Sequence, residues 1–180
     1  MTLSNQDIRA ELELGNLRIE PLAEGAIQPA SVDLRLGDRF LRHFGGPIDV
    51  KEAGTYGKWI PLQHDTLCVK PGFFFLASTI ERVRIPDYLV GRVEGKSSLG
   101  RLGITVHATA GYIDAGFEGQ ITLEIHNQLD VAVTLHAGMP VSQLSLMRLS
   151  SPAHPAYAGK YQQQDGPRVS EYWRNFKEAK

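Results

Sequence analysis

The stretch Gln120-Ile-Thr-Leu-Glu-Ile-His126 alternates apolar and polar residues along its whole length. Side chains of a β-strand point to opposite faces in turn, so this alternation predicts a strand with one buried face. Leu123 and its apolar neighbours would lie in a core, whereas Thr122, Glu124 and His126 would share the opposite face. The stretch predicts β-structure and places one glutamate on a polar face.

The same period of two recurs elsewhere along the chain. Residues 31–36 alternate around Asp33 and Arg35, and residues 131–135 alternate after a short turn. Turn signals such as Gly45-Gly46-Pro47 separate the alternating runs. With 18 Gly and 10 Pro among short strands, the sequence predicts an all-β fold of the sandwich, jelly-roll or small-barrel kind.

One short helix is expected at the N-terminus. Ser4 is a good N-cap, and Asp7 stands three residues later, as in a capping box. Leu3 and Ile8 occupy the positions of a hydrophobic staple, and Gly15 is placed to end the helix.

Length and composition limit the organisation to one domain over residues 1–180. Apolar residues make up 42% and charged residues 22%, which excludes a disordered chain. Residues 157–180 are polar and are expected to form an extended C-terminal tail. The net charge of −1 argues against partners bound through bulk charge, so neither nucleic acid nor a membrane is expected.

The single cysteine, Cys68, fits a reducing compartment and is expected to be a buried small hydrophobic residue. No signal peptide or membrane-spanning run is visible, so a cytoplasmic location is expected.

A basic segment, Lys96-Ser-Ser-Leu-Gly-Arg101, combines two cations with two hydroxyls and a glycine. It is not a Walker A loop, because three residues rather than four separate Gly91 from Gly95-Lys96. A short helix beginning near Ser97 would add free N–H groups to an anion site. A solvated loop remains the simpler alternative.

A glycine-rich hairpin precedes the Glu124 strand. Gly111, Gly116 and Gly119 would let the backbone approach a ligand closely, and Asp114 lies among them. The alternation leaves Glu124 with two alternatives: a solvated residue on an outer face, or a candidate general acid/base on the wall of a cleft.

The six histidines are scattered and form neither H-x-E nor H-E-x-x-H, so no zinc centre is expected. His107, in the run Ile104–Ala108, is expected to be a structural strand residue.

Several of these segments together resemble the dCTP deaminase family, over nearly the whole chain. The matching segments, in order, are residues 28–37, 94–101, 109–114 and 122–124, followed by Tyr157, Lys160 and Gln164 in the tail. The resemblance implies a distorted jelly-roll β-barrel of the trimeric dUTPase-like type. It also implies a homotrimer with active sites between neighbouring subunits.

The resemblance supplies roles for individual residues. It makes Glu124 catalytic, supported by Ser97 and Arg101, and lets Asp114 contact the deoxyribose. The remaining nucleotide-binding positions are Lys96, Ser98, Leu99, Gly100, Thr122, Leu123, Gln143, Tyr157, Lys160 and Gln164. The tail would close over the active site.

The implied ligands are dCTP, dUTP and, as a feedback inhibitor, dTTP. Mg²⁺ would arrive bound to the triphosphate, with no metal site of the protein's own and no zinc. Gly111 and Tyr112 resemble the family members that continue from dUTP to dUMP and diphosphate, where single-step deaminases carry a basic pair. A dUTP diphosphatase without deaminase activity and a non-catalytic nucleotide-binding module remain the alternatives.

Overall fold

A computed structural model describes residues 1–176, and most of that chain is β-structure, as predicted. The helices and 3₁₀ turns are α1 (Asn5–Glu13), η1 (Ala53–Thr55), α2 (Ser97–Gly100) and η2 (Tyr172–Phe176). The first six strands are β1 (Arg18–Glu20), β2 (Ile27–Gln28), β3 (Ser31–Phe44), β4 (Lys58–Gln63), β5 (Thr66–Val69) and β6 (Phe74–Arg84). The other six are β7 (Leu89–Gly95), β8 (Ile104–Thr105), β9 (Tyr112–Ile113), β10 (Glu118–Asn127), β11 (Val133–His136) and β12 (Pro140–Arg148).

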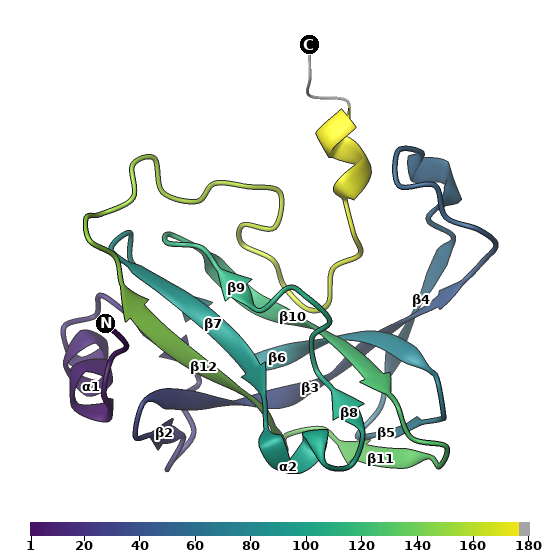
Figure 1. Cartoon of the computed structure of the whole chain (residues 1–180), viewed down its shortest axis with the longest axis horizontal. Coiled ribbons are helices and arrows are strands. Elements are labelled where there is room, and N and C mark those ends of the chain that lie inside the picture. The colour runs from purple at the N-terminus through teal and green to yellow at the C-terminus, as the bar shows by residue number, and fades with distance from the viewer. Residues whose placement is uncertain (177–180) are drawn as a thin grey trace.

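One long strand, β3, joins two groups of strands into a single curled sheet. The sheet order is β8-β10-β6-β3-β12-β7-β9, with β1 on β6 and with β2 and β4 on β3. The first part of β3 pairs with β12, whereas its end pairs with β6 and β4. Irregularities in the β3 registers fall where it changes partners. The sheet therefore wraps around one core (Figure 1).

The alternation read from the sequence corresponds to burial. Along β10, Ile121, Leu123 and Ile125 are buried and the residues between them are half-buried. The apolar positions of residues 31–36 are buried in the same way. Burial of these branched side chains is the main stabilising contribution that the strands make.

The N-terminal helix forms as predicted. The capping box between Ser4 and Asp7 is present, and Leu3 and Ile8 are buried. The chain leaves α1 through Gly15 at φ 70°, the left-handed conformation that ends many helices.

Two local predictions are wrong. Cys68 is exposed, because Leu67 and Val69 take the inward positions of the short β5–β11 ribbon and leave the residue between them facing outward. His107 lies outside a strand, since β8 ends at Thr105.

The C-terminal tail runs back over the sheet from Tyr157 to η2 (Figure 1). The part of the predicted tail at 177–180 lies outside the described residues. Within residues 1–176 no helix is long and apolar enough to cross a membrane.

Candidate active site

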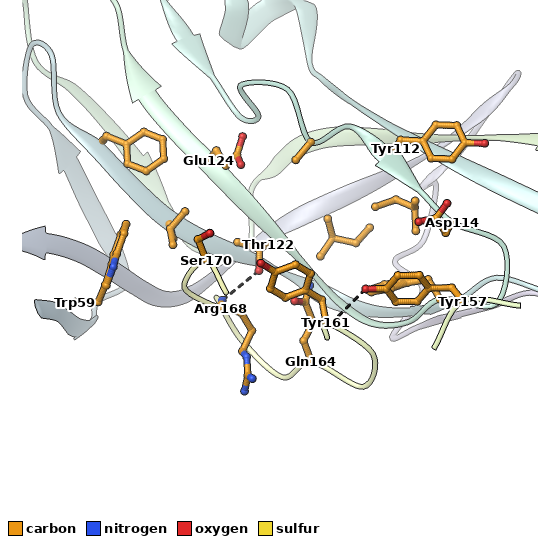
Figure 2. A pocket seen from close by; sticks show the side chains of 16 residues that line it. Trp59, Tyr112, Asp114, Thr122, Glu124, Tyr157, Tyr161, Gln164, Arg168 and Ser170 are labelled. Carbon is orange, nitrogen blue, oxygen red and sulfur yellow. Dashed lines mark hydrogen bonds between the residues drawn. The ribbon is translucent and has the colours of Figure 1, made fainter. Parts of the chain in front are cut away.

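A cavity of about 430 Å³ lies between β10, β9, β6, β4 and the C-terminal tail. Its lining combines aromatic rings with a small number of converging polar groups, including Asp114, Thr122, Glu124 and Arg168. That composition is typical of small-molecule sites. Figure 2 shows Asp114 at one end of the cavity, Trp59 at the other, and Glu124 between them.

Glu124 lies on the cavity wall and not on an open outer face, so its location is that of the second alternative left by the strand pattern. The Ala108 N–H donates to Glu124 Oε2 at 2.7 Å, and the Glu124 N–H donates to the Val106 carbonyl at 2.9 Å. The chain leaves the strand conformation after Thr105 and curves around this glutamate, which accounts for the irregular conformation of His107. One carboxylate oxygen is therefore held by the backbone.

Two glycines of the hairpin, Gly116 and Gly119, allow the C-terminal tail to approach the backbone closely. Gly116 has φ 91°, and a Cβ there would lie 2.7 Å from the Ala156 Cβ. Gly119 has φ 156°, and its Cβ would lie 3.0 Å from backbone atoms of Gln164. The close approach predicted for these two positions exists, but the approaching group is the protein's own C-terminal segment.

The tail binds along the N-terminal end of β10, where Gln164 forms an isolated parallel β-bridge with Gly119. The Gln163 N–H donates to the Glu118 carbonyl at 2.7 Å, and the Gln120 N–H donates to the Gln164 carbonyl at 3.0 Å. Further along, the Arg168 N–H donates to Thr122 Oγ1 at 3.1 Å, a bond drawn in Figure 2. This pairing brings Gln164 and Arg168 onto the cavity wall.

An ion pair between Arg39 and Asp165 holds the same part of the tail in place. The Arg39 guanidinium donates to both carboxylate oxygens of Asp165, at 3.1 and 3.0 Å, and to Gln120 Oε1 at 2.9 Å. The hydrogen bond from Arg39 holds the pKa of Asp165 below its usual value. Gly166 also donates its N–H to Gln120 Oε1.

Two tyrosines of the tail line the cavity. Tyr157 packs against Phe117, with ring centroids 6.1 Å apart, and its hydroxyl accepts the Tyr161 N–H at 3.3 Å. Burial raises the pKa of Tyr157, so its hydroxyl stays protonated at neutral pH. Tyr161 in turn accepts the Glu171 N–H at 2.9 Å.

The basic segment lies away from this cavity. The predicted short helix is present as α2, but its N-cap is Lys96 and no side chain caps it. Lys96 Nζ lies 2.6 Å from Asp33 Oδ2, and Gln143 Nε2 donates to Asp33 Oδ1 at 3.3 Å. Ser97, Ser98 and Arg101 are exposed, while Leu99 is buried.

Gly111 and Tyr112 occupy different surroundings. A Cβ on Gly111 would lie 2.8 Å from the Val93 carbonyl oxygen, and the Val93 N–H donates to the Gly111 carbonyl at 2.7 Å. Glycine is therefore required at this position for close approach to β7. Tyr112 lines the cavity with 57% of its surface exposed.

Five of the predicted nucleotide-binding residues line the cavity: Asp114, Thr122, Glu124, Tyr157 and Gln164. Residues 96–101 and Gln143 do not line it. Leu123 is fully buried, so only its backbone is available to a ligand. Lys160 lies outside the lining and donates to Asn175.

The lining residues that sequence reasoning missed include Trp59, Tyr161, Arg168 and Ser170. The tail residues could have been found from their proximity to Gln164, but Trp59 lies in a distant hairpin that no motif marks. Across residues 1–176 no group of three or more His, Cys, Asp or Glu side chains is arranged to hold a metal ion.

Comparison with known proteins gives sequence relatives over nearly the full chain. A model of the dCTP deaminase-like family matches residues 2–149. The chain is 46% identical over 190 residues to a Parafrankia protein named dCTP deaminase, dUMP-forming, covering 99% of this chain and 94% of that protein. A protein of the same name from Nocardia farcinica is 48% identical over 187 residues, with 98% and 94% covered.

Solved structures share the fold. The 2′-deoxycytidine 5′-triphosphate deaminase of Agrobacterium tumefaciens superposes with a TM-score of 0.65 at 24% identity, covering 81% of this chain and 47% of that one, so this chain spans about half of its length. A dUTPase of Staphylococcus bacteriophage 80alpha superposes with a TM-score of 0.50 at 16% identity, covering 76% and 93%. The predicted dUTPase-like jelly-roll fold is thereby confirmed.

Proposed function

The chain belongs to the dCTP deaminase-like family, and we propose that it deaminates dCTP to dUTP and ammonia and then hydrolyses dUTP in the same site to dUMP and diphosphate. The observation that carries the proposal is Glu124, a carboxylate fixed by the Ala108 N–H on the wall of a nucleotide-sized cavity that also holds Asp114. Full-length relatives named dUMP-forming support the second step.

Glu124 is the general base and then the general acid of the deamination. It takes a proton from water as the water oxygen bonds to C4 of cytosine, and it passes that proton to N3. The second proton of the water then moves to the exocyclic amino group, the C4–N bond breaks, and ammonia leaves. The Ala108 N–H holds Oε2 at 2.7 Å, which leaves Oε1 to exchange the protons.

The basic segment 96–101 would bind the triphosphate, with Ser97 and Arg101 orienting the water and stabilising charge that develops on the base. Because this segment lies outside the cavity of its own chain, the complete site requires the segment of a neighbouring subunit, as in a homotrimer. Gln143, beside Lys96 and Asp33, would belong to the same neighbouring half. Mg²⁺ would arrive on the triphosphate and keep most of its water.

Asp114 would contact the deoxyribose and then act as general base for the water that attacks the triphosphate. Thr122, Tyr157 and Gln164, together with the backbone of Leu123, would complete the nucleoside contacts, and Lys160 would add a cation when the tail closes. Tyr112 lies on the same wall as Asp114, so it is placed to influence the second step. dTTP would compete for the same sugar and triphosphate contacts, and the enzyme would work in the cytoplasm.

The test is incubation of the purified protein with dCTP and Mg²⁺, with chromatographic separation of nucleotides and assays of ammonia and diphosphate. Ammonia, dUMP and diphosphate without accumulating dUTP is the expected result. Ammonia with stable dUTP would remove the second step. Hydrolysis of added dUTP without any ammonia from dCTP would make the protein a dUTP diphosphatase, and binding without either product would make it a nucleotide-binding module.

A further inference from the structure

The cavity continues past Glu124 into an aromatic end that the proposed chemistry does not use. Trp59 of β4 forms this end together with Phe74 and Leu76 of β6. In Figure 2 the Trp59 ring is seen nearly edge-on, so one of its faces is turned along the cavity toward Thr122 and Glu124.

The β3–β4 hairpin places the His43 ring against the Trp59 ring. The His43 ring packs edge-to-face on it, with centroids 5.2 Å apart and an interplanar angle of 62°. His43 Nε2 is itself hydrogen-bonded to the Tyr56 carbonyl at 3.1 Å. Gly57 has φ 66°, and a Cβ there would lie 2.4 Å from His43 Nε2, so only glycine leaves the imidazole in place. The indole thus packs against a second ring whose position the turn determines.

The tail closes the same end of the cavity from the other side. Arg168 and Ser170 line the cavity with Trp59, and the Arg168 N–H is bonded to Thr122. A flat group bound between Asp114 and Trp59, with its plane parallel to the indole, would place one face on the aromatic ring and one edge near Glu124. A pyrimidine ring has this shape, and bases stack on aromatic side chains through their π-faces.

We propose that Trp59 is a positioning residue that receives the pyrimidine ring of the substrate on its indole face and holds C4 against Glu124. This inference rests on the proposed function, because it takes dCTP as the ligand and Asp114 as the sugar contact. It gives the β3–β4 hairpin a role in binding the base, and His43 supports that role by packing against the indole.

The test separates contact with the base from contact with the rest of the nucleotide. Binding of dCTP and of 2′-deoxyribose 5-triphosphate, which lacks the base, is measured for wild type, Trp59→Ala, Trp59→Phe and Ile60→Ala. Ile60 is the next residue of β4, exposed and outside the cavity lining, and serves as the matched control. Trp59→Ala is expected to weaken dCTP binding about tenfold and to leave the base-less triphosphate unchanged, because stacking on the base is lost. Trp59→Phe should recover most of the affinity.

A second measurement does not depend on the stability of the alanine variant. In a Trp173→Phe background, Trp59 is the only indole in the chain, and its fluorescence should be quenched by dCTP but not by the base-less triphosphate. Equal weakening of both ligands by Trp59→Ala, or an unchanged Trp59 signal when dCTP binds, would overturn the role of Trp59. Absence of turnover in the wild type, with the base-dependent quench intact, would overturn the proposed function and leave Trp59 as a base-binding residue.

Discussion

Two regions of the molecule differ in charge and in place: the cavity around β10 and the basic segment around α2. The cavity presents two carboxylates, Asp114 and Glu124, at a cluster of aromatic rings. The basic segment presents exposed Arg101 and two serines, with Lys96 paired to Asp33. A nucleoside suits the first region and a triphosphate suits the second, yet one chain keeps them apart.

The difference has a local cause. β10 carries Glu124 outward from the curled sheet under the tail, whereas β7 leads into α2 after pairing with β12 and β9. Under the proposed function, folding of one chain therefore produces two half-sites. In the proposed homotrimer, closed rotational symmetry would bring the half-site of one copy to the complementary half-site of the next. The following experiments test this arrangement.

The largest effect on turnover is expected from Glu124→Gln, which removes the proposed general acid/base from the cavity. Ammonia release from dCTP should fall by about 10²–10⁴-fold, the usual contribution of a general acid/base. Nucleotide binding should persist, because the amide keeps the size of the side chain and an oxygen for the Ala108 N–H. Steady-state ammonia assays and calorimetric binding measure the two quantities.

Glu118→Gln is the matched control for this variant. Glu118 lies on the same strand, pairs with Arg82 and does not line the cavity. It should retain turnover close to wild type. Comparable losses in the two variants would show that the strand, and not the Glu124 carboxylate, is sensitive to substitution.

Mixing two inactive variants tests directly whether the half-sites come from different subunits. Arg101→Ala should be nearly inactive alone, as should Glu124→Gln. After both are unfolded and refolded together in equal amounts, about one quarter of the sites in a random trimer should combine an intact Glu124 with an intact Arg101. Activity should therefore return on refolding of the mixture. A mixture as inactive as its components would contradict the shared site.

A smaller effect is expected from Tyr112→Arg, which changes the ratio of the two reactions. A cation on the wall beside Asp114 would oppose the role of that carboxylate as a base, so diphosphate release should fall about tenfold more than ammonia release. The comparison uses Tyr112 because a side chain at Gly111 would collide with the Val93 carbonyl, which would disturb the sheet in addition to the site. Equal loss of both products would count against Tyr112 as a determinant of the dUMP-forming step.

The sequence was most informative where a strand is half-buried. Alternation placed Ile121, Leu123 and Ile125 correctly, because period two is a direct consequence of strand geometry. The same pattern could not say whether Glu124 faces solvent or a cavity, since that depends on the path of residues 106–108 and of the tail. Both segments are irregular and have no periodic signal.

The resemblance to the dCTP deaminase family assigned roles to individual residues, which periodicity could not do. It did not indicate how far apart those residues lie within one chain. It named residues from both half-sites together without showing that one chain separates them. It also gave no sign of Trp59, because a hairpin residue that reaches a cavity from another part of the sheet shares no motif with Glu124. Cys68 was placed incorrectly because residue type alone does not show that it takes the outward position between Leu67 and Val69 in a two-stranded ribbon.

Weakening the attachment of the tail should have a modest effect on the binding of dCTP, because the tail lines the cavity, whereas the basic segment lies outside it. Arg39→Ala removes the contacts to Asp165 and Gln120. Because this ion pair is exposed, its loss should cost no more than about 1 kcal/mol, which corresponds to about a fivefold rise in KM for dCTP if the tail must be in place for binding. Arg84→Ala is a control, since this exposed arginine ends β6 outside the cavity lining. An unchanged KM in Arg39→Ala would show that the remaining backbone pairing is sufficient to hold the tail.

The smallest effect on activity is expected far from both half-sites, where Glu11 fastens α1 to the sheet. Tyr88, Arg148 and Asn16 donate to its carboxylate at 2.6, 2.8 and 3.1 Å. Burial works to raise the pKa of Glu11, but these hydrogen bonds outweigh it and leave the pKa below the ordinary value of 4.5. Burial and the bond to Glu11 raise the pKa of Tyr88 to about 12, so its hydroxyl remains a donor.

A carboxylate with a lowered pKa stabilises the fold fully above its unfolded pKa and loses that contribution as the pH falls through the folded one. Glu11→Gln should therefore lower the free energy of unfolding by about 1–2 kcal/mol at pH 7, with the gap to wild type closing below about pH 4.5. Urea unfolding at a series of pH values measures the gap, and Glu13→Gln, exposed on the same helix, is the control. Ammonia release should be unchanged in both variants, because α1 touches neither the cavity nor the basic segment. A pH-independent gap would mean that Glu11 stabilises the helix by packing, since a packing contribution does not titrate.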